Sequence, residues 1–139
     1  MRVVIDTNVL VSAALTPEGT PGRVVAAWLA VRFEAVTTEE LIEEVERVLA
    51  LDRIRSRLPD QGVHLRIGEL LRRAAEVVAP AERLSAFKDP ADNRLPETAS
   101  YGQADVIVSG DGAVLALREI GGTRVLPPSA LPGELMDER

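Results

Sequence analysis

The chain opens with Met1-Arg2-Val3-Val4-Ile5-Asp6-Thr7-Asn8-Val9-Leu10-Val11-Ser12, where a β-branched run leads directly into a carboxylate, a hydroxyl and an amide. The apolar run predicts a buried strand over residues 2–5, and the pattern after it predicts a helix over residues 7–15. A parallel strand delivers the next residue to the carboxyl edge of its sheet, where α/β proteins build their sites. We therefore expect Asp6 to lie at a functional position.

A second unit with the same order lies near the other end of the chain. In Val106-Ile107-Val108-Ser109-Gly110-Asp111, a predicted strand over 104–109 is again followed by a carboxylate. The other predicted elements are strands at 33–37 and 123–126, helices at 38–49, 61–78 and 111–120, a helix that begins at Thr20-Pro21, and a helix with Pro96 in its first turn. Strands that alternate with helices predict an α/β fold with a parallel sheet covered on both faces.

The length and composition narrow the possible chemistry. The 139 residues suit one domain, for which we expect a core over about residues 1–126 and a peripheral tail over 127–139. The sequence has no cysteine and a single histidine, His64. These counts exclude disulfides, thiolate metal sites and a cysteine nucleophile, and they argue against histidine-based zinc sites and triads. Any chemistry must therefore depend on carboxylates, hydroxyls, amides and arginine.

The charge is negative overall and unevenly distributed. A net charge of −6 is less typical of nucleic-acid binders than a basic balance. However, residues 39–46 contain five Glu, and residues 47–73 contain seven Arg against three acids. No basic-then-apolar leader precedes the first strand and no apolar run reaches membrane-spanning length, so we expect a cytoplasmic protein without a membrane partner.

Four acidic residues stand out, although each has an ordinary interpretation when taken alone. They are Asp6, Glu44, Asp92 and Asp111. Asp6 and Asp111 can cap the helices that follow them. Glu44 can be an ion-paired residue at the rim of the core. Asp92 can be a turn residue in Asp89-Pro90-Ala91-Asp92-Asn93.

Taken together, the four acids predict a metal site, because a doubly wound sheet brings their positions to one cleft. Several carboxylates at close range repel one another unless a cation joins them, and oxygen ligands suit Mg²⁺ or Mn²⁺. Such an ion can orient a phosphodiester and lower the pKa of a bound water, so we predict hydrolysis of a nucleic-acid backbone. Asn8 and Ser109 lie near the acids in this arrangement and are expected to position a phosphate or a water ligand.

Four segments with this order and spacing resemble the PIN-domain family of metal-dependent ribonucleases. They are most similar to its toxin-like branch, which is related to the VapC toxins of bacterial toxin–antitoxin pairs. The segments are Val4-Ile5-Asp6-Thr7-Asn8-Val9-Leu10-Val11-Ser12-Ala13, Thr38-Glu39-Glu40-Leu41-Ile42-Glu43-Glu44-Val45, Asp89-Pro90-Ala91-Asp92-Asn93 and Ala104-Asp105-Val106-Ile107-Val108-Ser109-Gly110-Asp111. The resemblance extends over residues 3 to about 126.

The resemblance implies a three-layer α/β/α fold with a central parallel sheet. It also implies RNA cleavage, a homodimer and inhibition by an antitoxin protein. The implied catalytic residues and ligands of Mg²⁺ or Mn²⁺ are Asp6, Glu44, Asp92 and Asp111, with Glu97 as an auxiliary acid. The sequence departs from the family at Ala113, where a second Asp is common, and at Pro96, in a helix that usually lacks proline.

Arginines close to the acidic helix are candidates for RNA binding. Arg53, Arg55 and Arg57 follow that helix, and Arg suits bidentate contact with phosphate. A solvated, salt-bridged surface is the alternative interpretation of these three residues.

Two other functions stay open. One is a catalytically weak or inactive PIN-like scaffold that binds RNA or a protein partner. The other is a receiver-like or phosphatase-like α/β protein, which needs a lysine beside a nucleophilic Asp. The single lysine, Lys88, has no evident place as that partner.

Overall fold

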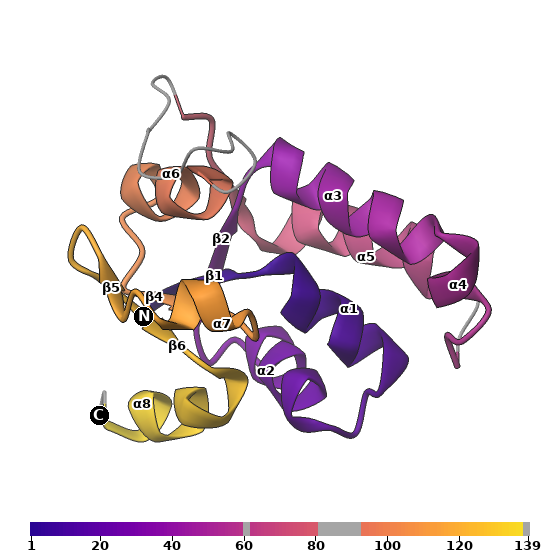
Figure 1. Cartoon of the computed structure of the whole chain (residues 1–139), viewed down its shortest axis with the longest axis horizontal. Coiled ribbons are helices and arrows are strands. Elements are labelled where there is room, and N and C mark those ends of the chain that lie inside the picture. The colour runs from indigo at the N-terminus through magenta and orange to yellow at the C-terminus, as the bar shows by residue number, and fades with distance from the viewer. Residues whose placement is uncertain (60–61, 81–92, 138–139) are drawn as a thin grey trace.

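A six-stranded sheet forms the centre of the computed structural model, which describes residues 1–59, 62–80 and 93–137 (Figure 1). The strands are β1 (Arg2–Ile5), β2 (Glu34–Thr37), β3 (Glu76–Val77), β4 (Val106–Val108), β5 (Glu119–Ile120) and β6 (Thr123–Leu126). They lie in the order β3-β2-β1-β4-β6-β5, and every neighbouring pair is parallel except β5 and β6. The predicted central parallel sheet is therefore confirmed, with one antiparallel edge strand added to it.

Helices cover both faces of this sheet. They are α1 (Thr7–Leu15), α2 (Thr20–Leu29), α3 (Glu39–Ala50), α4 (Asp52–Arg55), α5 (Val63–Ala74), α6 (Arg94–Tyr101), α7 (Gly112–Leu115) and α8 (Leu131–Asp137), with a short 3₁₀ helix, η2 (Pro128–Ala130), before α8. Alternate residues of a strand point to opposite faces, so the buried side chains separate into two cores. This arrangement confirms the predicted three-layer α/β/α fold.

The larger core lies between the sheet and α1, α2, α3 and α5. Val3 and Ile5 of β1 pack there with Trp28 of α2 and Ile42 of α3. Leu131, at the start of α8, belongs to the same core and is only 1% exposed. The tail that we expected to be peripheral therefore contributes to the main core, because its first leucine buries its apolar side chain there.

The smaller core lies on the opposite face of the sheet, under α6. Val4 of β1 and Ile107 of β4 pack there with Leu95 and Ala99 of α6. Pro96 lies in the first turn of α6, as predicted. Proline is tolerated at this place because the amide hydrogen that it lacks would have no helical partner there.

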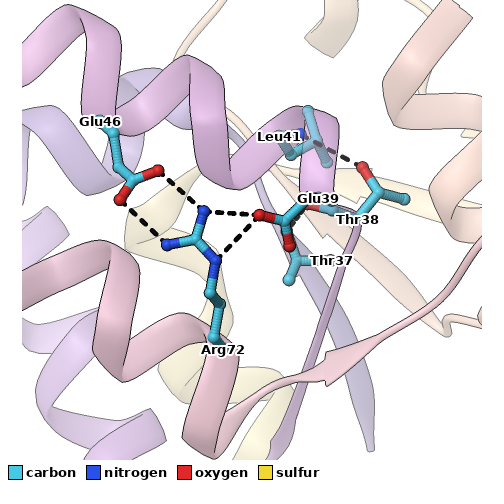
Figure 2. Close-up of polar contacts among 6 residues, drawn as sticks. All are labelled: Thr37, Thr38, Glu39, Leu41, Glu46 and Arg72. Carbon is cyan, nitrogen blue, oxygen red and sulfur yellow. Dashed lines mark hydrogen bonds and ion pairs between the residues drawn. The ribbon is translucent and has the colours of Figure 1, made fainter.

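Helix α3 carries Glu44, and two sets of polar contacts hold this helix in place (Figure 2). The hydroxyl of Thr38 accepts a 3.2 Å hydrogen bond from the backbone N–H of Leu41 and so caps the start of the helix. Arg72 of α5 lies between Glu39 and Glu46 of α3 and donates hydrogen bonds of 2.5–3.0 Å to both carboxylates. These contacts join α3 to α5, which lie alongside each other (Figure 1).

The helix predicted over residues 61–78 is too long. It ends at Ala74, and residues 76–77 pair with β2 as the edge strand β3. The backbone N–H of Val78 then donates a 2.8 Å hydrogen bond to the carbonyl of Thr37. This segment therefore forms a strand because it pairs with the edge of the sheet. A strand of two residues is too short to show a periodicity, so the sequence pattern did not predict it.

The helix predicted over residues 111–120 is also too long. It ends at Leu115, and residues 119–120 form β5, which pairs with β6 in a tight hairpin. Gly121 and Gly122 connect the two strands and both have positive φ, 55° and 90°. A Gly-Gly pair suits a two-residue hairpin turn, so the sequence did contain the signal for this strand.

The remaining predicted boundaries differ from the observed ones by two residues or fewer. The helices α4 and α8 were not predicted. Asp92 and Lys88 lie outside the described residues, as does the side chain of His64. Within the described part of the chain, none of the helices combines the length and the apolar character that a membrane span requires.

Candidate functional site

The candidate site lies at the carboxyl ends of β1 and β4, which are neighbouring parallel strands in the middle of the sheet. Ile5 of β1 pairs in register with Val108 of β4. The backbone N–H of Asp6 then donates a 2.9 Å hydrogen bond to the carbonyl of Val108. Because the pairing continues to the ends of both strands, the segment that contains Asp6 lies next to the loop that contains Asp111.

A cavity of about 570 Å³ opens at this edge of the sheet. Carboxylates from three separate places line it: Asp6 before α1, Glu44 within α3 and Asp111 before α7. Its other polar lining residues are Thr7, Asn8, Ser12 and Arg94, with apolar side chains from α1, α3, α6 and α7 between them. The fold thus brings three of the four predicted acids to one cavity, and the fourth, Asp92, lies outside the described residues.

Two side chains hold the carboxylate of Asp6. The hydroxyl of Ser109 donates a 2.7 Å hydrogen bond to Oδ2 of Asp6, and Nδ2 of Asn8 donates a 3.3 Å hydrogen bond to the same oxygen. Asp6 occupies the N-cap position of α1, yet its side chain makes no capping hydrogen bond. The ordinary interpretation of Asp6 as a helix cap therefore does not account for its side chain.

The same two side chains also hold the loop after β4. Oδ1 of Asn8 accepts a 3.1 Å hydrogen bond from the backbone N–H of Gly110. Oγ of Ser109 accepts a 3.0 Å hydrogen bond from the backbone N–H of Asp111. Asn8 and Ser109, which we expected to position a phosphate or a water, thus fix the two acidic segments relative to each other.

The surroundings of Asp6 disfavour its charged form. Burial raises the pKa of Asp6 above its ordinary value, and the negative charges of Glu44 and Asp111 raise it further. Hydrogen bonds from Ser109 and from the backbone amide of Thr7 act in the opposite direction but do not cancel this increase. A positive charge within the cavity would remove the conflict among the three carboxylates.

A hydroxyl group contacts the second carboxylate. Oε2 of Glu44 accepts a 3.0 Å hydrogen bond from Oγ1 of Thr7, a buried residue at the start of α1. This contact ties α1 to α3 directly beside Asp6. Thr7 was not among the predicted site residues, although it lies inside the motif that opens the chain.

Asp111 combines an ordinary role with a place in the cavity. Its Oδ1 accepts a 2.9 Å hydrogen bond from the backbone N–H of Ala113 and so caps α7, as one of the two interpretations of Asp111 expected. The residue is also exposed and lines the cavity, so a solute can reach its carboxylate. Ala113 lines the same cavity and offers no ligand at the position where the resemblance leads us to look for a second Asp.

The other predicted candidates are not among the described residues that line the cavity. Glu97 is buried within α6, only 2% exposed, and is not among the described residues that line the cavity. Arg53 and Arg55 of α4 and Arg57 just after it are exposed, and none of them belongs to the described lining of the cavity. Figure 1 shows α4 directly after the end of α3. Arg94, which does line the cavity, was missed because nothing in its local sequence distinguishes it from the other arginines.

The donor atoms in the cavity fit a hard divalent cation. They are carboxylate, hydroxyl and amide oxygens, which Mg²⁺ and Mn²⁺ prefer. Among the described residues, which leave out Asp92, no three Asp, Glu, His or Cys side chains lie close enough together to form a metal-binding group. The three carboxylates thus share one cavity without forming a ready-made metal-binding group in this part of the chain.

Comparison with known proteins gives two findings. Residues 2–113 match a family model described as PIN domain. The chain is also similar to the uncharacterized protein MJ1680 of Methanocaldococcus jannaschii, with 25% identity over 119 residues that cover 86% of this chain and 76% of that protein. The family match extends from the first strand into α7, so it includes all three carboxylates of the cavity.

Proposed function

The chain belongs to the PIN domain family, and from this premise we propose that it is a metal-dependent endoribonuclease that hydrolyses RNA phosphodiester bonds. PIN domains are generally metal-dependent nucleases. The observation that carries the proposal is the convergence of Asp6, Glu44 and Asp111 from three elements on one cavity. Such a set of oxygen donors suits cation-assisted hydrolysis of a phosphodiester.

In this proposal Asp6, Glu44 and Asp111 hold Mg²⁺ or Mn²⁺, and the family resemblance adds Asp92 as a fourth ligand and Glu97 as an auxiliary acid. When bound, the cation supplies Lewis acidity, which lowers the pKa of a water molecule and offsets the charge on the phosphodiester. The protein itself supplies the arrangement of the carboxylates.

Hydrogen bonds orient these carboxylates before any ligand arrives. Ser109 holds one oxygen of Asp6, and Thr7 holds one oxygen of Glu44. Both donors are buried, so their own positions are fixed by packing. Because these bonds already restrict the side chains of Asp6 and Glu44, less free energy is lost to ordering them when a ligand binds.

We also propose that Arg53, Arg55 and Arg57 contact the RNA backbone. All three are exposed, and they follow the helix that carries Glu44. Their positive charges would offset the repulsion between an acidic protein and an anionic substrate.

A cleavage assay with matched variants tests the proposed activity. We expect the protein to cleave labelled single-stranded RNA in Mg²⁺ or Mn²⁺ and not in EDTA. Asp6→Asn and Asp111→Asn should abolish cleavage, whereas Asp52→Asn, the same change on the exposed surface of α4, should retain it. Cleavage in EDTA, or wild-type cleavage by Asp6→Asn, would contradict the proposal.

Ala113 favours a second candidate function, a catalytically weak or inactive scaffold that binds RNA or a protein partner. It lines the cavity without offering a ligand. A cation that binds the folded state raises the melting temperature, so a titration with Mn²⁺ separates the two functions. A nuclease site should show a rise in Tm that Asp6→Asn removes, and an inert scaffold should show none.

We further propose that the chain is the toxin of a toxin–antitoxin pair, forms a homodimer and is inhibited by an antitoxin protein. The support for this part is the resemblance to the VapC-like branch. It predicts a small DNA-binding reading frame directly upstream of the gene, whose product copurifies with the chain and suppresses cleavage. If that reading frame is missing and the chain has the mass of a monomer by light scattering, the toxin role is wrong while the nuclease activity stands.

A further inference from the structure

We infer that Arg94, held in place by Glu40, binds a phosphate group of the RNA backbone at the edge of the carboxylate cavity. The inference rests on the proposed function and adds a substrate contact to it. Arg94 is the first residue of α6 and the one cationic side chain among the described residues that line the cavity. It is distinct from the three arginines near α4.

A contact with α3 anchors the guanidinium group of Arg94. Its Nε lies 3.0 Å from Oε2 of Glu40. A guanidinium carries five N–H donors in a planar fork, and this contact directs one edge of the fork toward Glu40. The other donors belong to the two Nη groups, which commonly bind two phosphate oxygens at once.

The anchor point places the positive charge beside the carboxylates rather than among them. Glu40 precedes Glu44 by four residues on α3, so the two lie on the same face of the helix, about 6 Å apart along its axis. A guanidinium anchored at Glu40 leaves the acids of the cavity to a cation. It also gives an anionic strand one fixed positive charge at an otherwise acidic cavity.

A purely structural role does not explain the pair well. The side chains of Arg94 and Glu40 are 31% and 39% exposed, and ion pairs at such exposure contribute little to stability. The same exposure makes the guanidinium accessible to a ligand. Its place on the cavity wall then points to binding of substrate.

The salt dependence of RNA binding tests this inference. A fluorescent single-stranded RNA is titrated in EDTA, where metal-dependent cleavage does not interfere, at several KCl concentrations with wild type, Arg94→Met and Arg73→Met. Arg73 is the control because it is an exposed arginine paired with Glu69 on its own helix. Loss of one phosphate contact should weaken binding by about 10-fold. It should also lower the slope of log affinity against log salt by about 0.7.

A second pair of variants tests the positioning by Glu40. Glu40→Gln and Glu39→Gln remove the same charge from neighbouring residues of α3, but Glu39 is bonded to Arg72 instead. Removal of a negative charge alone should tighten RNA binding slightly. We expect Glu39→Gln to do so and Glu40→Gln to weaken binding severalfold, because Arg94 loses its anchor.

The inference is wrong if Arg94→Met binds RNA with the affinity and salt slope of wild type, or if its salt slope is unchanged while its Tm falls. Arg94→Lys should keep the salt slope and lose part of the affinity. The proposed nuclease function fails separately, through cleavage that Asp6→Asn does not affect. The binding measurements need no cleavage, so the two failures are distinguishable.

Discussion

The hydroxyl of Ser109 donates a 2.7 Å hydrogen bond to Oδ2 of Asp6, although 103 residues separate the two in sequence. Ser109 is fully buried, and its Oγ also accepts a hydrogen bond from the backbone N–H of Asp111. Because a lone pair of the Ser109 oxygen accepts the hydrogen bond from Asp111, the hydroxyl hydrogen is available to donate to Asp6. One small side chain thus sets the relative positions of two carboxylates in the cavity.

Ser109→Ala should therefore reduce the rate of RNA cleavage more than the affinity for RNA. Hydrogen bonds to charged groups contribute about 1.5–3 kcal/mol, so we expect kcat to fall by about 10-fold or more with little change in KM. Thr123→Val is the control, because it removes a buried hydroxyl that bonds the carbonyl of Ala104 away from the cavity. The control should lower Tm and keep kcat. A Ser109→Ala variant with wild-type kcat would show that orientation of Asp6 is not required.

Asp6→Asn should raise the melting temperature in EDTA, and the gain should grow with pH. The pKa of Asp6 is raised in the folded state, chiefly by burial, so the folded protein keeps this proton to higher pH than the unfolded chain. Below the unfolded pKa both states are protonated and Asp6 has no effect. As pH rises, the charged side chain increasingly destabilises the fold, and the effect is complete above the folded pKa. Thermal melts from acidic to neutral pH, with Asp52→Asn as control, measure the gain. A gain that is constant with pH, or a loss of stability at neutral pH, contradicts this prediction.

Arg72→Met should lower Tm slightly at neutral pH and have no effect in acid. The hydrogen bond from Arg72 holds the pKa of Glu46 below its ordinary value. The pair therefore stabilises the fold above the unfolded pKa of Glu46, and this contribution is lost as pH falls through the folded pKa. The change is small because both side chains are partly exposed. Thermal melts at neutral and acidic pH measure this change in Tm, and Arg73→Met on the same helix is the control. An equal loss at both values would assign the effect to packing instead of charge.

Val31→Gly should stabilise the protein. Val31 has a φ of 58° just after α2, and the residue is 84% exposed. A left-handed conformation costs an L-residue about 1–2 kcal/mol, glycine avoids that cost, and the exposed side chain gives up little packing. We expect a net gain of about 1 kcal/mol by chemical denaturation, after the entropy that glycine adds to the unfolded chain. Val31→Ala, which keeps a Cβ, should gain less. A glycine variant that is less stable than wild type would refute the assignment of strain to this residue.

The parts of the fold that sequence reasoning predicted are those encoded locally. The strands before Asp6 and Asp111 are continuous apolar runs that end on polar residues, and each is buried as predicted. The strands at 76–77 and 119–120 escaped prediction because each has two residues and exists only through pairing with a neighbouring strand. Only the second had a local signal, in its Gly-Gly turn.

The candidate site likewise has a part that local sequence predicts and a part that depends on how distant elements pack. The carboxylates at the ends of strands could be predicted from their position in the chain. The contacts from Thr7 to Glu44 and from Glu40 to Arg94 join distant elements, so they depend on how α1 and α6 pack against α3. Likewise, the sequence placed Ser109 near the acids without showing that it bonds Asp6, because that bond depends on the register of β1 and β4.

The central claim is that carboxylates from three elements share one cation, and calorimetric titration with Mn²⁺ tests it most directly. Wild type and the control Asp52→Asn should bind Mn²⁺ with the same affinity. Asp6→Asn, Glu44→Gln and Asp111→Asn should each weaken binding by at least about 10-fold, the lower end of the effect that even an outer-shell partner has. If wild type binds no Mn²⁺, or if Glu44→Gln binds it as tightly as wild type, the three carboxylates do not form a shared cation site.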